Sequence, residues 1–243
     1  MQYLRMPYGI KPASGIFQRL IENRLKNIPK TVVRIDDILV TGETDEEHLE
    51  NLSMVLNVLK EMGVTVNDKC SFFVDEVEYM GHIISKNGIR TNDKKVADIL
   101  QIPAPKNVKD IESFIGGINY YSKYIPDMAT IANPLYRLLT KDQQWEWTDL
   151  HNQAFNSLKM KLTTAPVLIN YNPKLPLKLP CDASGFGLGA VLSHVLPDNS
   201  ERPIAYASRT LNEHEKNYSQ LDKDPLSLGL KNIINIYLVE NLY

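Results

Sequence analysis

Two adjacent aspartates in the middle of an apolar run constrain this chain more than any other feature. Asp36 and Asp37 interrupt the run TVVRIDDILV at residues 31–40. Apolar and β-branched residues on both sides predict two short strands joined by a tight turn. Presenting two carboxylates on one turn costs desolvation and like-charge repulsion unless a cation such as Mg²⁺ neutralises them. Aspartate is also an ordinary turn residue, so the pair taken alone favours a turn that binds nothing.

The segments around the pair narrow this choice. The block MPYGIKPASGIFQR occupies residues 6–19, KCSFF begins at Lys69, and EYMGHII begins at Glu78. In this order and at these separations the blocks closely resemble the reverse transcriptases of gypsy-type LTR retrotransposons. The resemblance continues through residues 105–126, resumes at Trp145-Glu146-Trp147-Thr148 and at Cys181-Asp182-Ala183-Ser184, and fades after about Leu228. It therefore covers nearly the whole chain.

The resemblance implies an α+β fold: a partial reverse-transcriptase palm with a helical thumb, followed by an incomplete RNase H-like α/β domain. On this reading residues 1–90 form a palm without fingers, residues 91–140 form a thumb-like helical region, and residues 141–243 form a connection and a partial RNase H-like domain.

The same resemblance assigns roles to individual residues. The catalytic residues that it implies are Asp36, Asp37, Asp182 and Asp224, of which Asp36, Asp37 and Asp182 are also metal ligands. The nucleotide- or template-binding residues that it implies are Gly9, Lys11, Pro12, Gln18 and Lys69. The primer grip that it implies consists of Tyr79, Met80, Gly81 and His82. Taken singly, each has a simpler explanation: Lys69 as a solvated lysine, and Gly81-His82 as an ordinary turn. Cys70 and Phe17 are expected to be packing residues.

The chemistry implied by the resemblance is phosphoryl transfer with two Mg²⁺ (or Mn²⁺) ions in the intact family. The implied partners are an RNA template, a DNA primer, an RNA–DNA hybrid, dNTPs and other segments of the Pol polyprotein. A membrane is not among them.

Bulk properties agree with such a protein. The 243 residues are 43% hydrophobic, enough for two domains or more. Two cysteines far apart in sequence give no disulfide framework. Without a signal peptide or an apolar run of membrane-spanning length, the product is expected to be intracellular, cytoplasmic or nuclear, and not secreted. The formal net charge of −2 requires any nucleic-acid site to be a local basic groove.

Periodicity and capping signals predict the main elements. Helices are expected over residues 11–28, from the Thr44–Glu47 capping box to Gly63, after Asn107, and after Thr148. Strands are expected near residues 64–66, 72–74, 82–84, 175–179, 187–194 and 204–207.

Several residues depart from the family pattern. Arg34 stands where the family usually has tyrosine and could pair with the aspartates in competition with Mg²⁺. Pro180 lies in an expected central strand, and Pro225 follows Asp224, which replaces a glutamate, in an expected helix. The family's fingers, its first palm aspartate and its later RNase H aspartates are expected to lie outside this chain.

Three hypotheses remain. The chain is a segment of a reverse transcriptase–RNase H polyprotein, or a decayed or domesticated remnant that at most binds nucleic acid or protein, or an unrelated metal-dependent phosphotransferase built on an Asp-Asp turn. The order of the blocks favours the first two. Activity of this polypeptide by itself is not expected.

Overall fold

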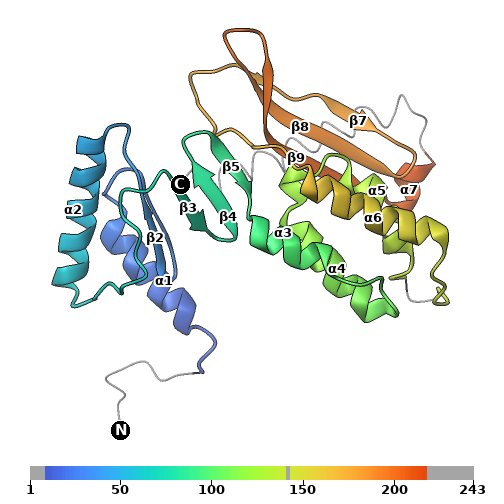
Figure 1. Cartoon of the computed structure of the whole chain (residues 1–243), viewed down its shortest axis with the longest axis horizontal. Helices are drawn as coiled ribbons and strands as arrows, with labels where there is room; N and C mark the ends of the chain where they lie inside the picture. Colours follow the sequence, from blue (N-terminus) through green and yellow to red (C-terminus); the bar gives the residue numbers. More distant parts are fainter. Residues whose placement is uncertain (1–8, 141–142, 218–243) are drawn as a thin grey trace. The chain divides into compact units, whose positions relative to one another are not determined.

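The computed structural model describes residues 9–140 and 143–217. By contacts within the chain, the protein divides into two compact units, Met1–Val74 and Asp75–Tyr243 (Figure 1). This division falls between the aspartate hairpin and the Tyr79–His82 turn, so the two predicted sites belong to different units.

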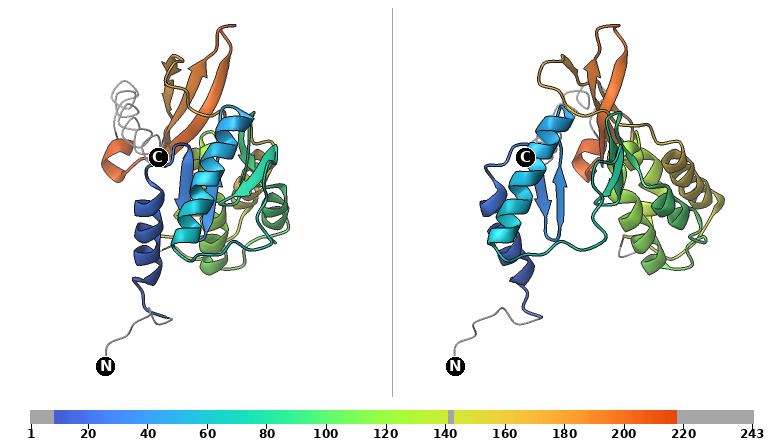
Figure 2. Two further views of the ribbon diagram at one scale, coloured as in Figure 1. Left: turned by 90° about the vertical axis from the view of Figure 1, so that its left-hand side faces the viewer. Right: turned by 60° about the vertical axis from the view of Figure 1, so that its left-hand side comes forward.

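The first unit is a strand hairpin covered by two helices. Its elements are α1 (Ala13–Leu25), β1 (Thr31–Arg34), β2 (Asp37–Val40) and α2 (Asp45–Glu61). β1 and β2 pair antiparallel, α1 lies against β1, and α2 lies against β2 (Figure 2). The predicted strand–turn–strand arrangement of residues 31–40 is confirmed.

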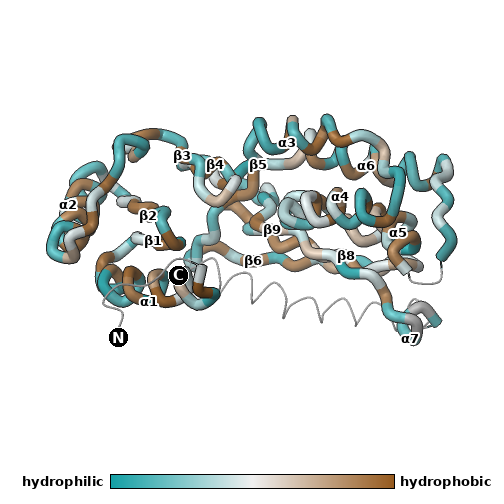
Figure 3. Tube along the Cα trace, turned by 90° about the horizontal axis from the view of Figure 1, so that it is seen from below, coloured by the Kyte–Doolittle hydropathy of each residue, from teal (hydrophilic) through white to brown (hydrophobic). Residues whose placement is uncertain are grey.

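Alternation of apolar and polar residues explains why these helices dock on the hairpin. Ile21, Leu25, Val55 and Leu59 are buried, and Val33, Ile38 and Val40 of the hairpin pack against them. Polar and apolar segments alternate along α1 and α2 (Figure 3), as expected for helices that bury one face. The core is small, so polar contacts at the ends of the hairpin also matter.

Both ends of α2 follow the sequence prediction. The Thr44 hydroxyl accepts a hydrogen bond from the Glu47 amide at 3.2 Å. After the helix, Gly63 has φ +69°, and the Val64 amide donates to the Leu59 carbonyl at 2.9 Å. This is a Schellman-type ending, which favours glycine at the left-handed position.

The prediction of strands near residues 64–66 and 72–74 is wrong. These segments are irregular, and Val66, Phe72, Phe73 and Val74 are about half exposed, at 51%, 48%, 54% and 51%. Their composition is strand-like, but strand preference is realised only against neighbouring strands. In the described part of the chain these segments pair with none.

The second unit begins with a three-stranded meander. It comprises β3 (Glu76–Tyr79), β4 (His82–Ser85) and β5 (Gly88–Thr91), joined by two tight turns. The expected strand at residues 82–84 is confirmed within β4, whereas β3 and β5 were not predicted.

A helical region follows the meander and contains the largest core. Its elements are α3 (Asp93–Leu100), α4 (Val108–Tyr120), the 3-10 turn η1 (Ser122–Tyr124), α5 (Met128–Arg137) and α6 (Asp149–Thr163). Side chains with almost no exposure fill its centre: Ile111, Phe114, Ile118, Tyr124, Leu135, Leu158 and Leu162. The predicted cap is confirmed, since the Asn107 side chain accepts from the Asp110 amide at 3.0 Å.

The last described part is an antiparallel sheet beside α5 (Figure 1). It contains β6 (Leu177–Lys178), β7 (Cys181–Ala183), β8 (Gly187–Val195) and β9 (Glu201–Thr210), and α7 (Glu213–Lys216) follows. β6 and β7 pair with successive parts of β8, while β9 pairs along its other side. Together β6 and β7 are one strand interrupted at Leu179-Pro180.

Pro180 explains this interruption. Proline cannot donate to a strand ladder, so it is tolerated at an edge or a break. Its carbonyl still accepts a hydrogen bond from the Val191 amide at 3.1 Å. The expected disruption at Pro180 is thus observed as this interruption, and in the described residues the interrupted strand lies at an edge of the sheet.

The sheet is tied to α5 by short polar contacts. The Ala129 amide donates to the Ser208 hydroxyl at 3.0 Å, and the hydroxyls of Thr130 and Ser184 are 3.0 Å apart. A Cβ at Gly189 would lie 2.3 Å from a carboxylate oxygen of Asp127. Glycine at this position therefore lets the helix start approach the sheet closely.

A two-residue bridge links the meander to the segment that leads into this sheet. Ile89 and Leu168 exchange backbone hydrogen bonds of 2.7 and 2.9 Å, and the Ile169 amide donates to the Pro203 carbonyl at 2.9 Å. Beside this bridge, Gly88 has φ +126°, and a Cβ there would lie 2.1 Å from the Leu168 carbonyl oxygen.

Within the described residues, none of the helices combines the length and the apolar character required to cross a membrane.

Gly88→Ala is expected to lower the free energy of unfolding by about 2–4 kcal/mol, because the side chain is strained at this φ and collides with Leu168. Gly116→Ala is the matched control. Gly116 lies in α4 with open space around it, so alanine there should stabilise by about 0.5–1 kcal/mol. Urea denaturation of both variants checks this, and equal stability of the two variants would contradict it.

Candidate functional site

The aspartate pair lies at the tip of the β1–β2 hairpin. Ile35 and Asp36 form the two-residue turn, and Asp37 is the first residue of β2. All three are exposed, so both carboxylates face solvent. Arg34 stands directly opposite Asp37 across the hairpin. In the described part of the chain no ion pair joins Arg34 to either aspartate, so the expected pairing is not observed.

The turn itself is strained. Ile35 has φ +53°, a conformation that a β-branched residue rarely adopts. Such a residue persists only where its surroundings fix it, and such positions cluster at functional sites.

Gln18 of α1 supplies the restraint. Its carbonyl oxygen accepts a hydrogen bond from the Ile35 amide, and its amide nitrogen donates to the Val33 carbonyl at 2.8 Å. One side chain thus fixes the backbone on both sides of Arg34. The sequence pointed to Gln18 as a nucleotide- or template-binding residue, and the contacts of its amide group show that it also shapes the aspartate turn.

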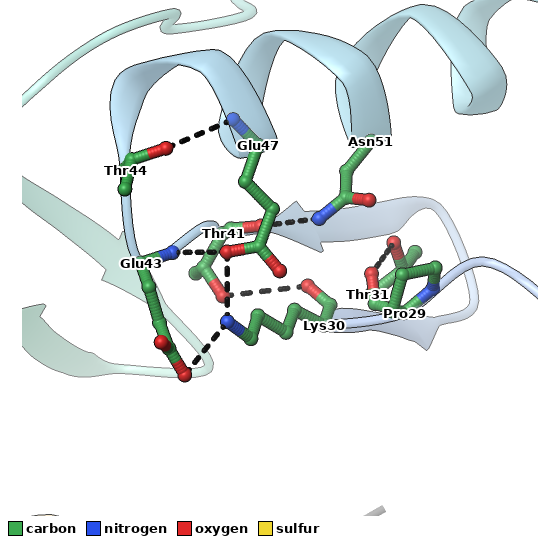
Figure 4. Close-up of polar contacts among 8 residues, drawn as sticks. All are labelled: Pro29, Lys30, Thr31, Thr41, Glu43, Thr44, Glu47 and Asn51. Carbon is green, nitrogen blue, oxygen red and sulfur yellow. Dashed lines mark hydrogen bonds and ion pairs between the residues drawn. The ribbon is translucent and has the colours of Figure 1, made fainter.

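The opposite end of the hairpin is held by a polar cluster (Figure 4). The Lys30 ammonium contacts Glu47 at 2.8 Å and Glu43 at 3.1 Å, and the Asn51 amide donates to the Thr41 carbonyl at 2.9 Å. Glu47 also accepts from the Glu43 amide at 2.6 Å. The second half of the predicted capping box therefore reaches Glu43 and Lys30, which joins α2 to the hairpin.

The remaining predicted nucleotide- or template-binding residues lie on exposed loops or at a helix start. Gly9 has φ +83°, Lys11 is exposed, and Pro12 precedes α1. Lys69 is exposed in a turn where its amide donates to the Asn67 side chain at 2.8 Å. These residues are accessible to a ligand.

In the second unit, the predicted primer-grip residues form the turn between β3 and β4. Tyr79 and His82 are paired, and the two residues between them, Met80 and Gly81, have φ +49° and +68°. Met80 is 39% exposed, while His82 is half-buried. The turn therefore presents Met80 outward and directs His82 inward.

Aromatic residues of α4 and η1 surround His82. Its ring is stacked on Tyr120 with centroids 5.3 Å apart, and its Nδ1 lies 3.1 Å from the Tyr124 hydroxyl. Burial, followed by the charge of Lys123, lowers the pKa of His82 to about 4. Burial also lowers the pKa of Lys123 to about 8. His82 is thus neutral near pH 7.

The RNase H-like carboxylates are only partly described. Asp182 is exposed on β7 opposite Gly189, and its carboxylate accepts a hydrogen bond from the Ala183 amide at 2.9 Å. Asp224 lies outside the described residues, as does Pro225. Within residues 9–140 and 143–217, no group of three or more His, Cys, Asp or Glu side chains is arranged to hold a metal ion.

Comparison with known families covers both halves of the chain. Residues 1–84 match the family described as "Reverse transcriptase (RNA-dependent DNA polymerase)", and residues 147–230 match the "RNase H-like domain found in reverse transcriptase". The chain therefore contains a reverse transcriptase region, residues 1–84, followed by an RNase H-like region, residues 147–230.

Curated proteins with similar sequences include transposon polyproteins. The Transposon Tf2-3 and Tf2-4 polyproteins of Schizosaccharomyces pombe are each 35% identical to it over 230 residues, which are 93% of this chain. These residues make up 17% of each relative, so the chain spans about a sixth of their length. It is thus similar to a retrotransposon reverse transcriptase with an RNase H-like region.

Solved structures agree. A foamy viral protease-reverse transcriptase "dRH" in complex with double-stranded DNA has a TM-score of 0.85 and 27% identity, over 96% of this chain and 41% of that one. The foamy viral protease-reverse transcriptase in complex with an RNA/DNA hybrid has a TM-score of 0.82 and 26% identity, over 96% of this chain and 32% of that one. The predicted fold class, a partial reverse transcriptase followed by an RNase H-like region, is confirmed.

Sequence reasoning missed the residues that support the two turns. Tyr120, Tyr121 and Tyr124 lie at the end of α4 and around η1. Their spacing fits one face of a helix end but does not show which turn they meet, because that turn lies 40 residues earlier.

Gln18→Met is expected to remove both hydrogen bonds to the hairpin and to destabilise the first unit by about 1–2 kcal/mol. Amide exchange at Ile35, followed by NMR, should become faster. Arg19→Met is the matched control on the exposed side of the same helix and should leave the Ile35 amide unchanged. Equal exchange at Ile35 in both variants would show that Gln18 does not fix the turn.

The depressed pKa of His82 predicts acid sensitivity. The unfolded chain takes up a proton near pH 6.5 and the folded chain only near pH 4, so stability falls as pH drops through this window. Lys123 adds no slope there, because its own window lies above about pH 8. Urea unfolding between about pH 7 and pH 5 should therefore show a smaller loss of stability in His82→Gln than in the natural protein. An equal loss in both proteins would assign the slope to other groups.

Proposed function

We propose that this chain forms part of an RNA-directed DNA polymerase, with the metal site at Asp36 and Asp37 and the primer contact at the Tyr79–His82 turn. The observation that carries the proposal is the hairpin tip, where two adjacent carboxylates are exposed on a strained turn that Gln18 fixes. A turn that served only to reverse the chain would need neither the strain nor the restraint.

The carboxylates at the tip suit a divalent cation of the kind that this family uses. Both are exposed oxygen ligands, and Mg²⁺ commonly takes one or two carboxylates together with substrate phosphates. Asp36 and Asp37 would hold the ion, and Mg²⁺ or Mn²⁺ there would stabilise the charge that develops during phosphoryl transfer. Gly9, Lys11, Pro12 and Lys69 would contribute contacts to the nucleotide or template.

Nucleic acids are the proposed partners. The similar foamy viral structures contain double-stranded DNA or an RNA/DNA hybrid, which supports an RNA template, a DNA primer and their hybrid as ligands here. dNTPs and other segments of the same polyprotein complete the proposed set. Such a role places the protein inside the cell, in the cytoplasm or the nucleus.

We further propose that Asp182 and Asp224 belong to a ribonuclease H-like site, with Asp182 as a metal ligand. The match of residues 147–230 to the RNase H-like family supports this, as does the exposure of Asp182 on β7.

Arg34 favours a second candidate function, nucleic-acid binding without catalysis. A cation opposite Asp37 opposes binding of a divalent ion at the hairpin tip, while it still attracts phosphate. The two candidates differ in metal affinity, which can be measured directly.

Mn²⁺ binding, followed by paramagnetic broadening of backbone amide signals, tests the metal site. We expect broadening centred on the β1–β2 turn and its loss, at least about 100-fold in affinity, in Asp36→Asn and Asp37→Asn. Arg34→Tyr should strengthen binding several-fold, because it removes a nearby positive charge.

The matched control is Asp98→Asn, which removes an exposed carboxylate on α3. It should leave the broadening at the hairpin unchanged. If Mn²⁺ does not approach the hairpin in the natural protein but does so in Arg34→Tyr, the binding-only function is favoured. Broadening that survives both aspartate substitutions would refute the metal site.

A further inference from the structure

The Met80–Gly81 turn has a conformation that its sequence does not favour. A two-residue hairpin loop with both residues at positive φ normally uses asparagine, aspartate or glycine. Here the first residue is Met80, with φ +49°. A residue with a Cβ in the left-handed region is less stable by about 1–2 kcal/mol, so other contacts must fix the turn.

Two tyrosines at the end of α4 hold this turn by its carbonyl oxygens. The Tyr120 hydroxyl donates to the Met80 carbonyl, and the Tyr121 hydroxyl donates to the Gly81 carbonyl at 3.2 Å. Hydrogen bonds to two successive carbonyls fix the orientation of both peptide planes. The rings also pack against the turn, since a Cβ at Gly81 would lie 3.4 Å from Tyr120.

A third tyrosine holds the residue that follows. Tyr124 is completely buried, and its hydroxyl lies 3.1 Å from Nδ1 of His82. Burial raises the pKa of Tyr124, so its hydroxyl stays protonated and can donate to the neutral histidine. Two charged groups act on this cluster, Lys123 on His82 and Glu78 on Tyr121.

These contacts divide the turn into groups that the tyrosines bind and a side chain that stays exposed. The carbonyl oxygens of Met80 and Gly81 and the ring of His82 are engaged by the tyrosines. The Met80 side chain, at 39% exposure, remains open to a ligand. The His82 ring is therefore directed into the tyrosine cluster.

We propose that Tyr120, Tyr121 and Tyr124 are positioning residues for the 3′ end of a bound primer strand, because they set the orientation of the turn that contacts it. The proposal rests on the function proposed above, in which the Tyr79–His82 turn meets the primer. It adds that the accuracy of this contact depends on three hydroxyl groups in the helical region.

Tyrosine-to-phenylalanine substitutions test the proposal in the full chain, since they remove a hydroxyl and keep the ring. Tyr120→Phe and Tyr121→Phe are the main variants. Tyr120 is 48% exposed, so its substitution should leave the fold intact. Tyr136→Phe is the matched control, because the Tyr136 hydroxyl bonds to Asn119 on the same helical region at 3.4 Å and not to the turn.

The first measurement is amide hydrogen exchange across Tyr79–His82 without nucleic acid. Loss of one hydrogen bond should speed exchange by about 2- to 10-fold in Tyr120→Phe and Tyr121→Phe. Tyr136→Phe should match the natural protein. Unchanged exchange in both main variants would show that the tyrosines do not hold the turn.

The second measurement uses a primer–template duplex with 2-aminopurine at the recessed 3′ end. A second duplex carries the probe well inside the paired region. In Tyr120→Phe and Tyr121→Phe, the fluorescence change at the terminal probe should fall by at least about half, while the internal probe and the affinity for the duplex change by less than about twofold. If the tyrosine hydroxyls only stabilised the fold, their loss would change the fluorescence of both probes equally.

The two measurements separate the possible failures. Faster exchange with an unchanged terminal probe would overturn the positioning role and leave the proposed function standing. If the natural protein binds the duplex but does not distinguish the terminal probe from the internal one, the primer contact proposed for this turn is wrong. Hydrogen exchange then still decides whether the tyrosines hold the turn.

Discussion

Restraint of the hairpin backbone by the Gln18 side chain is the interaction on which the aspartate pair depends. Without it, nothing described in the first unit offsets the left-handed conformation of Ile35, and the direction of Asp36 and Asp37 would not be fixed. The Lys30–Glu43–Glu47 cluster restrains the other end of the same hairpin. The exposed carboxylates therefore lie on a short element that is anchored at both ends, as a metal site requires.

The second unit also contains a strained turn, which is restrained by different side chains. There the strained turn is Met80–Gly81, and hydroxyl groups of Tyr120 and Tyr121 replace the amide of Gln18. In each case a helix next to the turn supplies donors or acceptors to the backbone and leaves side chains at the tip exposed, Asp36 and Asp37 in the first unit and Met80 in the second. Polar side chains that bond to backbone in this way have small individual effects on stability, yet they decide where a neighbouring side chain points.

The sequence predicted the elements whose signals are local. The Asp36–Asp37 hairpin, the Thr44 and Asn107 caps and the Gly63 helix ending all appear where spacing placed them. The prediction of strands at residues 64–66 and 72–74 was wrong, because strand formation depends on partner strands that a local sequence pattern does not contain. The supports of the two turns could not be predicted either, since Tyr120 and Met80 are 40 residues apart and their contact follows from packing alone. The family resemblance pointed to these two turns, and the structure shows which side chains hold them.

The backbone bridge between Ile89 and Leu168 bears on where this protein can be cut. It joins β5 to the segment before the last sheet, and Ile169 continues the connection to Pro203 at β9. A boundary drawn by function, with a palm ending near residue 90 and an RNase H-like part starting near residue 141, separates partners of this bridge. A fragment that ended before Leu168 would leave the outer edge of β5 with unpaired backbone groups, and such edges recruit strands from other molecules. The boundaries expected from function therefore do not coincide with the boundaries of the parts that are held together by backbone pairing.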